Sequence, residues 1–314
     1  MKRIRIARTP SLSMALFALG SCLVLSSVGA AELPPGAQAL SLEGKALYAA
    51  APGEDTLAKL AAAKRDYDAN PEVAENVIWY GRRTAYAGDY QRAIEIFSEG
   101  IERFPSDPRF YRHRGHRYIS TREFDRAIDD FLRAVVLMQG MAPATEPDGL
   151  PNAQNIPLTT TQGNVWYHLG LAYYLKQDWP LALAAFQNGY RLGGNDDNLV
   201  STGHWIYMIL RRMGEEERAA EALADISANM NIVENTSYHQ LCLLYRGELD
   251  VAALAGADGD DPSNAAVAYG LANYFYYNGD RARSDALLAR IVDGASWSSF
   301  GFIAAEADLA NPSR

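Results

Sequence analysis

The sequence predicts an all-α fold, a right-handed α-solenoid of helix–turn–helix repeats that ends in a C-terminal capping helix. Two observations carry this prediction. A set of small and aromatic residues recurs at a spacing of 34 residues, and Gly-containing turns separate segments of helical periodicity. A fixed period of this length is typical of stacked helical hairpins. Apolar residues make up 48% of the 314 residues, so the chain has enough apolar surface for a packed core.

The repeated set is clearest between residues 76 and 190. Its three copies are Gly81, Tyr90, Ala93 and Phe97, then Gly115, Phe124, Ala127 and Phe131, then Gly170, Trp179, Ala182 and Phe186. The second copy follows the first by 34 residues. The third follows the second by 55 residues, which is one period plus an insertion of 21. The small residues let the two helices of each hairpin approach closely, and the aromatic residues fill the gap to the next hairpin.

This layout resembles the tetratricopeptide (TPR) repeat. The resemblance is strong over 76–190 and weak over the rest of 71–310. It implies repeats 1 and 2 over 71–140, then repeats 3 to 6 and a capping helix over 162–310. The fourth unit is expected to lack the small residue of its first helix, and residues 300–309 are expected to form the cap, which shields the last apolar face of the array.

Residues 1–31 have the composition of an export signal. Four basic residues precede an apolar stretch from Leu12 to Val28, and small residues suit cleavage before Ala31. A lipoprotein signal is the other interpretation, because Leu19 to Cys22 loosely resembles a bacterial lipobox and Cys22 would then be acylated. The sequence therefore predicts an exported protein, periplasmic or secreted, with membrane anchoring only if Cys22 is lipidated.

The segment 32–70 is expected to combine an extended leader, rich in Pro, Gly and Ala, with a helix over 54–68. Removal of the signal takes away four positive charges, so the net charge falls from −9 to about −13. An acidic chain of this kind does not bind nucleic acid nonspecifically. The one cysteine left, Cys242, lies in an apolar run and is expected to be a buried small hydrophobe.

One segment breaks the period. Residues 141–161 carry four prolines, which excludes a helix there. Long irregular loops inside compact arrays are uncommon and often functional. Two interpretations stay open: a tolerated surface insertion, or a loop that lies across the groove of the array.

A cluster of basic residues in the second repeat is the strongest local charge feature. Its members are Arg109, Arg112, His113, Arg114, His116 and Arg117. The TPR resemblance implies a groove lined by one row of first-helix residues, namely Arg82, Tyr86, Arg109, Arg112, His116, Asn164, Tyr167 and Tyr174. A cationic and aromatic groove suits an acidic peptide, a carboxyl terminus or another anion. The alternative is that these arginines pair with acidic residues of the second helices, Glu95, Glu99, Asp125, Asp129 and Asp130.

No catalytic constellation is recognisable. The chain has no nucleophile motif and no phosphate-cradling Gly loop. Arginines surround His113 and His116 where a metal site would need acidic or Cys ligands, so we expect no metal and no cofactor. The Asp258 to Asp261 stretch lacks the further ligands of a calcium loop and is expected to be a turn.

We therefore expect no enzyme. The predicted function is a non-catalytic protein-binding or peptide-binding scaffold or adaptor of the bacterial cell envelope, with its partner in the concave groove. The alternative is a receptor for a small anionic or saccharide ligand under the Pro-rich loop. Some TPR proteins bind carboxyl termini through a clamp of Lys, Asn and Arg. The corresponding positions here, Ile78, Arg82, His113, Asn164 and His168, keep only its basic character.

Overall fold

The computed structural model describes residues 33–254 and 262–311, and the chain from Leu33 onward forms one compact unit. The predicted signal segment 1–31, Cys22 within it, and the Asp258 to Asp261 stretch lie outside the described residues. In the two described ranges, no helix is both long and apolar enough to cross a membrane.

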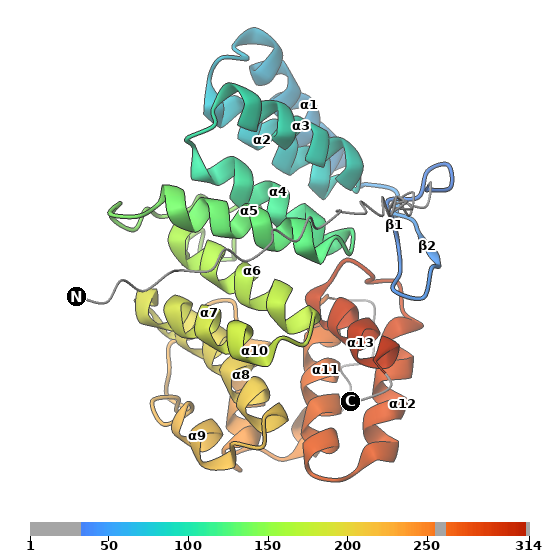
Figure 1. Ribbon diagram of the computed structural model, residues 1–314, viewed down its shortest axis with the longest axis vertical. Coiled ribbons are helices and arrows are strands. Elements are labelled where there is room, and N and C mark those ends of the chain that lie inside the picture. The colour runs from blue at the N-terminus through green and yellow to red at the C-terminus, as the bar shows by residue number, and fades with distance from the viewer. Residues whose placement is uncertain (1–32, 255–261, 312–314) are drawn as a thin grey trace, which may run out of the picture. The chain divides into compact units, whose positions relative to one another are not determined.

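Consecutive helices pack as antiparallel hairpins (Figure 1). The first half contains α1 (Glu54–Ala69), α2 (Ala74–Tyr86), α3 (Tyr90–Arg103), α4 (Pro108–Ser120), α5 (Phe124–Leu137), α6 (Thr161–Leu175) and α7 (Trp179–Leu192). The second half contains α8 (Asp196–Arg212), α9 (Glu216–Glu221), α10 (Thr236–Tyr245), the short 3-10 helix η1 (Val251–Leu254), α11 (Pro262–Tyr277), α12 (Arg281–Val292) and α13 (Phe300–Ala310). The predicted all-α solenoid of TPR-like hairpins is confirmed, and α13 packs against α11 and α12 as the expected cap.

The 34-residue period corresponds to one repeated contact between a glycine and a phenylalanine. A Cβ atom added to Gly81 would lie 2.5 Å from the Phe97 ring, and one added to Gly170 would lie 2.7 Å from the Phe186 ring. Real Cβ atoms do not approach carbon that closely, so any side chain would push the helices of the hairpin apart. The 34-residue period therefore reflects the close contact between this glycine and this phenylalanine in each of the strong repeats.

The turn inside each hairpin requires a left-handed backbone at one position. Glycine takes this position in three turns, with φ of 90° at Gly88, 77° at Gly214 and 87° at Gly279. Arg122 and Gln177 adopt the same conformation, with φ of 66° and 60°. A non-glycine residue there costs about 1–2 kcal/mol. At Arg122, a buried ion pair with Glu306 of α13 offsets this cost.

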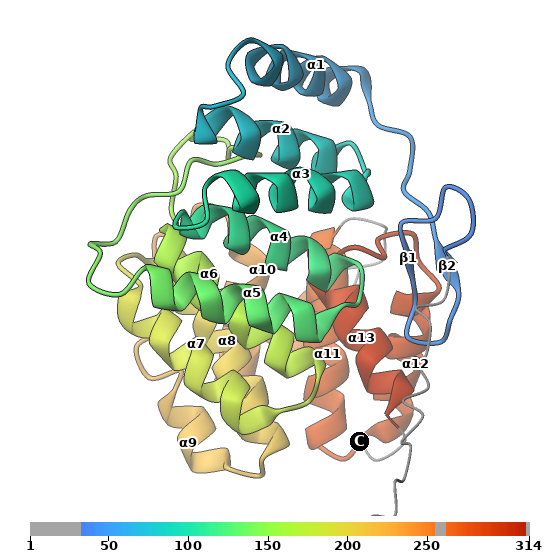
Figure 2. The ribbon, with the colours of Figure 1, turned by 45° about the horizontal axis from the view of Figure 1, so that its top comes forward.

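The last helix of the array lies beside its first elements (Figure 2). Arg122, in the α4–α5 turn, pairs with Glu306 of α13 at 2.9 Å and donates to the carbonyl of Trp297 at 2.8 Å. The leader forms a small hairpin of β1 (Ala39–Leu40) and β2 (Ala46–Leu47). Its Leu42 N–H donates to Glu306 Oε1, and Trp297 Nε1 donates to the carbonyl of Tyr48. The predicted extended leader thus contains one short ordered piece that contacts the C-terminal cap.

Candidate ligand cavity

The Pro-rich loop 141–161 lies across the inner face of α2 and α4. Arg82 donates to the carbonyl of Pro147 at 2.9 Å, and Arg83 donates to the carbonyl of Gly149 at 2.8 Å. Arg112 pairs with Glu146 of the loop at 2.9 Å, and both side chains are less than one-tenth exposed. Of the two interpretations left open by the sequence, the structure supports a loop that lies across the groove.

This loop occupies the part of the groove that the sequence assigned to a ligand. Arg82, Tyr86 and Arg112 contact loop residues. Arg109 lies aside, bonded to Asp107 and Glu75. These four residues therefore hold the fold together on this side of the array.

Tyr174 does not face the groove. It is 2% exposed, and its hydroxyl lies 2.8 Å from that of Tyr269, between α6 and α11. The cause is the return of the C-terminal helices, which cover this end of α6. The alternative of pairing with second-helix carboxylates holds for Arg114, which forms two hydrogen bonds to Asp130.

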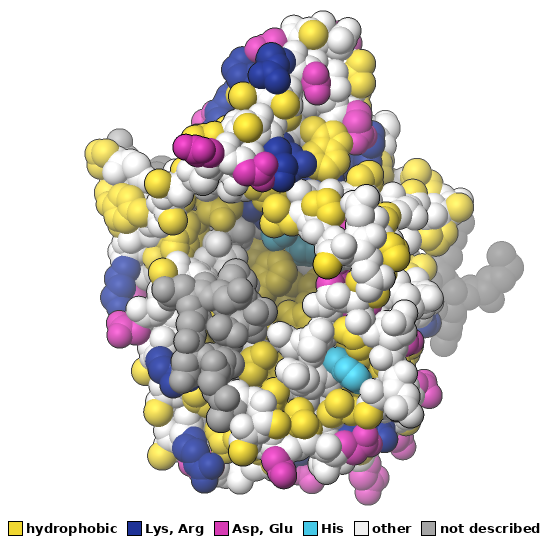
Figure 3. All heavy atoms as spheres, turned by 180° about the vertical axis from the view of Figure 1, so that it is seen from behind, with side chains coloured by type: hydrophobic (Ala, Val, Ile, Leu, Met, Phe, Trp, Pro, Cys, Tyr) yellow, Lys and Arg dark blue, Asp and Glu magenta, His cyan; other side chains and the backbone are white. Residues whose placement is uncertain are grey.

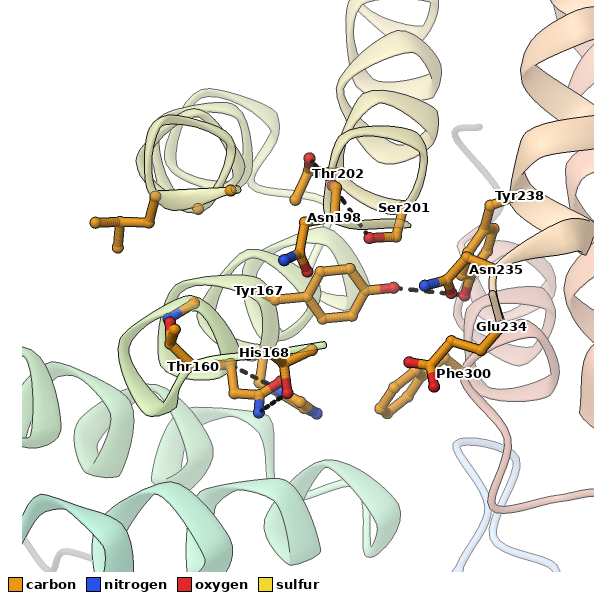
Figure 4. Close-up of a pocket in the computed structure, with 16 residues that line it drawn as sticks. Thr160, Tyr167, His168, Asn198, Ser201, Thr202, Glu234, Asn235, Tyr238 and Phe300 are labelled. Atoms are coloured by element: carbon orange, nitrogen blue, oxygen red, sulfur yellow. Dashed lines mark hydrogen bonds between the residues drawn. The ribbon is translucent and has the colours of Figure 1, made fainter. Parts of the chain in front are cut away.

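The other three predicted residues, His116, Asn164 and Tyr167, line an open hollow (Figure 3). It has two adjoining parts. The first, the amide chamber, has a volume of about 240 Å³ and is shown in Figure 4. The second, the arginine chamber, has a volume of about 450 Å³. The two chambers share Glu234, Asn235, Tyr238 and Phe300, and together they form the concave cavity.

Neutral polar groups line the amide chamber. They come from α6, α8 and the segment before α10, and they include Thr160, Asn164, Tyr167, Asn198, Ser201, Thr202 and Asn235 (Figure 4). Tyr167 accepts a hydrogen bond from Trp205 Nε1 at 2.8 Å. Burial raises the pKa of Tyr167 well above its usual value, so the phenol stays neutral. Apart from Glu234, the wall thus offers hydrogen bonds from neutral groups.

Three neutral histidines, His113, His116 and His168, lie near the arginines of α4. The ring centroids of His116 and His168 lie 4.4 Å apart, and His113 stacks on Phe97 at 5.6 Å. Burial lowers the pKa of all three well below 6.5, and nearby arginines lower it further. Among the described residues, no three His, Cys, Asp or Glu side chains gather as a metal would require.

Arg117 is the charged group that faces the arginine chamber from α4. The residue is 8% exposed, and its guanidinium lies 5.2 Å from the centre of the Tyr90 ring. Burial lowers its pKa from the ordinary arginine value. Ser120, Ser237 and Ser299 line the same chamber.

Sequence reasoning missed most of this chamber. Arg117 belongs to the basic cluster but was not placed in the groove-facing row. Tyr238 and Phe300 lie in segments assigned to a degenerate repeat and to the cap, and no spacing in the sequence marks them as neighbours of α4. The chain brings Tyr238 there on α10 and Phe300 on α13.

No protein-family model matches the chain. Similar solved structures include YrrB, described as a TPR protein with an unusual peptide-binding site, at 18% identity over 79% of this chain and 98% of that chain, with a TM-score of 0.42. A putative kinesin light chain of Podosopora anserina with TPR-like repeats is 14% identical over 70% of this chain and 93% of that one, with a TM-score of 0.42. A structure of Naa15/Naa10 bound to HypK-THB is 16% identical over 76% of this chain and 34% of that chain, with a TM-score of 0.37. The fold assignment itself rests on the hairpin packing described above.

Proposed function

We propose that this chain is a non-catalytic binding protein of the bacterial cell envelope that holds a segment of a protein partner in the concave cavity. The lining of the amide chamber carries the proposal. Amide and hydroxyl side chains such as Asn164, Asn198 and Thr202 match the donors and acceptors of a peptide backbone. The adjoining aromatic wall of Tyr238 and Phe300 suits an apolar side chain.

Within residues 33–254 and 262–311, Cys242 and His204 lack the setting of an activated catalytic group, which supports a binding role. Burial raises the pKa of the Cys242 thiol far above its usual value, and Cys242 is fully buried. His204 is likewise enclosed among aromatic rings, and burial lowers its pKa to about 3. Neither group has the exposed, activated setting that covalent catalysis needs.

The place of action is part of the proposal and rests on the sequence of residues 1–31 alone. A basic start, an apolar stretch and small residues before Ala31 are the parts of an export signal. Cleavage there would release a periplasmic or secreted protein. Acylation of Cys22 would anchor it to a membrane instead.

Site-specific photocrosslinking tests the partner. A photoreactive residue at Leu150, 73% exposed at the arginine chamber, should crosslink to a protein in cells. The same residue at Leu181, 46% exposed on α7 and not part of either chamber, is the control and should give no such product.

A second pair of variants asks whether the cavity itself is needed. Ser237→Trp fills the arginine chamber, whereas Thr236→Trp adds the same ring at an exposed neighbour outside it. The crosslink from Leu150 should disappear in the first variant and persist in the second. Equal crosslinking in both variants, or from Leu181, would contradict the proposal.

A further inference from the structure

We propose that the arginine chamber binds a carboxylate, held by Arg117 and the first turn of α13. If the carboxylate is the chain end of a protein partner, this inference rests on the proposed function. A free organic acid would use the same groups.

Arg117 lacks the hydrogen-bond or ion-pair partner that the other buried arginines have. Arg82 donates to the carbonyl of Pro147 at 2.9 Å. Arg112 pairs with Glu146, Arg122 with Glu306 and Arg212 with Asp308, at 2.9, 2.9 and 2.5 Å. Within residues 33–254 and 262–311, the guanidinium of Arg117 has no hydrogen bond and no ion pair, only the contact with the Tyr90 ring. An isolated buried charge is unfavourable, so a guanidinium in this state is set up for an anion from outside.

The first turn of α13 adds a second attraction for an anion at the same place. Ser299, Phe300 and Gly301 line the chamber. The backbone N–H groups of Phe300 and Gly301 belong to the first helical turn, where no preceding helical carbonyl accepts from them. The aligned peptide dipoles give that end of the helix a partial positive charge.

Packing fixes this turn in position before any ligand arrives. A Cβ atom on Gly301 would lie 2.4 Å from the carbonyl oxygen of Ala265, so α13 touches α11 backbone to backbone. The Ser299 hydroxyl caps the turn by accepting from the N–H of Phe302 at 3.4 Å. Arg117 and these N–H groups thus come from two different helices, α4 and α13, that both line the chamber.

The surroundings favour a single negative charge with an apolar body. Glu234, at the junction of the two chambers, disfavours a dianion such as phosphate. Partial burial raises the pKa of Glu234 above its usual value. Tyr90, Tyr238 and Phe300 provide aromatic walls, and about 450 Å³ is within the range of small-ligand pockets.

Calorimetry with small probes tests the site on the purified chain. Benzoate and hexanoate should bind and raise the melting temperature, whereas neutral benzamide should bind at least tenfold more weakly. Inorganic phosphate should not compete with benzoate. Equal binding of benzamide and benzoate, or binding of phosphate alone, overturns the carboxylate assignment.

Variants of Arg117 separate a binding role from a structural one. Arg117→Met should weaken benzoate binding at least tenfold. In the absence of ligand it should melt no lower than the wild-type chain, because the charge that it removes has no partner. Arg117→Lys keeps the charge but loses the planar fork, so its affinity should be intermediate. Unchanged benzoate binding by Arg117→Met refutes the site.

A tripeptide with a free carboxyl terminus and its amidated form identify the source of the carboxylate. Binding of the free form only assigns the site to a chain end. Binding of benzoate and hexanoate but of neither peptide assigns it to a free organic acid. If benzoate binds through Arg117 while no protein crosslinks at Leu150, the carboxylate site stands and the partner proposal fails. If a protein crosslinks at Leu150 but benzoate does not bind, the partner proposal stands and the carboxylate site fails.

Discussion

Replacing Glu146 by Gln removes the carboxylate with which the Pro-rich loop pairs with Arg112 of α4. Glu146 is 7% exposed, and its Oε1 lies 2.9 Å from Arg112 Nη2. Breaking a buried pair from one side typically costs about 3–5 kcal/mol, because the remaining charge stays desolvated. Since each kcal/mol of lost stability lowers the melting temperature by about 2–4 °C, the expected decrease is ~6–20 °C.

Thermal and urea unfolding measure this loss, with two controls. Asp129→Asn, an exposed change on α5, should leave the midpoint near that of the wild-type chain. The double variant Arg112→Met with Glu146→Leu removes both charges and should recover most of the stability. The loop should also become sensitive to protease near residues 148–156 in Glu146→Gln. A single variant that unfolds within ~1 kcal/mol of wild type would show that the pair does not anchor the loop.

Three further outcomes follow from the same contacts. Gly81→Ala should lower the unfolding free energy by about 1–3 kcal/mol, because its Cβ would meet the Phe97 ring at 2.5 Å, while Gly194→Ala, with open space around it, should be close to neutral in chemical denaturation. Burial lowers the pKa of four histidines, so the unfolded chain binds more protons below pH 6.5. The free energy of unfolding should therefore fall between pH 6.5 and 5 by up to ~5 kcal/mol per pH unit. In His113→Phe this slope should be smaller by ~1.4 kcal/mol per pH unit, and urea titrations at each pH measure it. Mass spectrometry of the exported chain should find Ala31 as the first residue, and an acylated Cys22 instead would contradict cleavage there.

The hairpins were predictable because their decisive contacts are local. Gly81 and Phe97 are sixteen residues apart in the sequence, and their contact recurs in every strong repeat. The repeat pattern does not identify a hairpin whose two helices approach closely at another position. In the fourth unit, Tyr207 takes the expected glycine position, and the close approach moves one turn back to Gly203, whose Cβ would lie 2.9 Å from Ile226. The expectation that this unit lacks a small residue in its first helix was therefore wrong.

The cavity was less predictable because groups far apart in the sequence decide which residues face it. Arg82 and Arg112 have the spacing of groove-facing residues, yet carbonyl and carboxylate groups of residues 146–147 contact them. The sequence does not show whether this loop or an outside ligand contacts the two arginines. Arg117, next to His116 and five positions after Arg112, has no ion pair with any residue of the described part of the chain. The residue most suited to a ligand was thus the neighbour of those that the repeat pattern selected.

The composition of α13 explains why the array closes. An ordinary capping helix is polar on its outer face, whereas Glu306 and Asp308 of α13 are 5% and 2% exposed. Two buried carboxylates on a helix rich in Ala and Phe require cationic partners, and Arg122 and Arg212 supply them from turns and helices of earlier repeats. These pairs hold the second half of α13 against the earlier repeats, while its first turn lines the arginine chamber. The cap and the candidate binding site are therefore one structural feature, and any change that releases Glu306 should also remove the helix terminus from the carboxylate site.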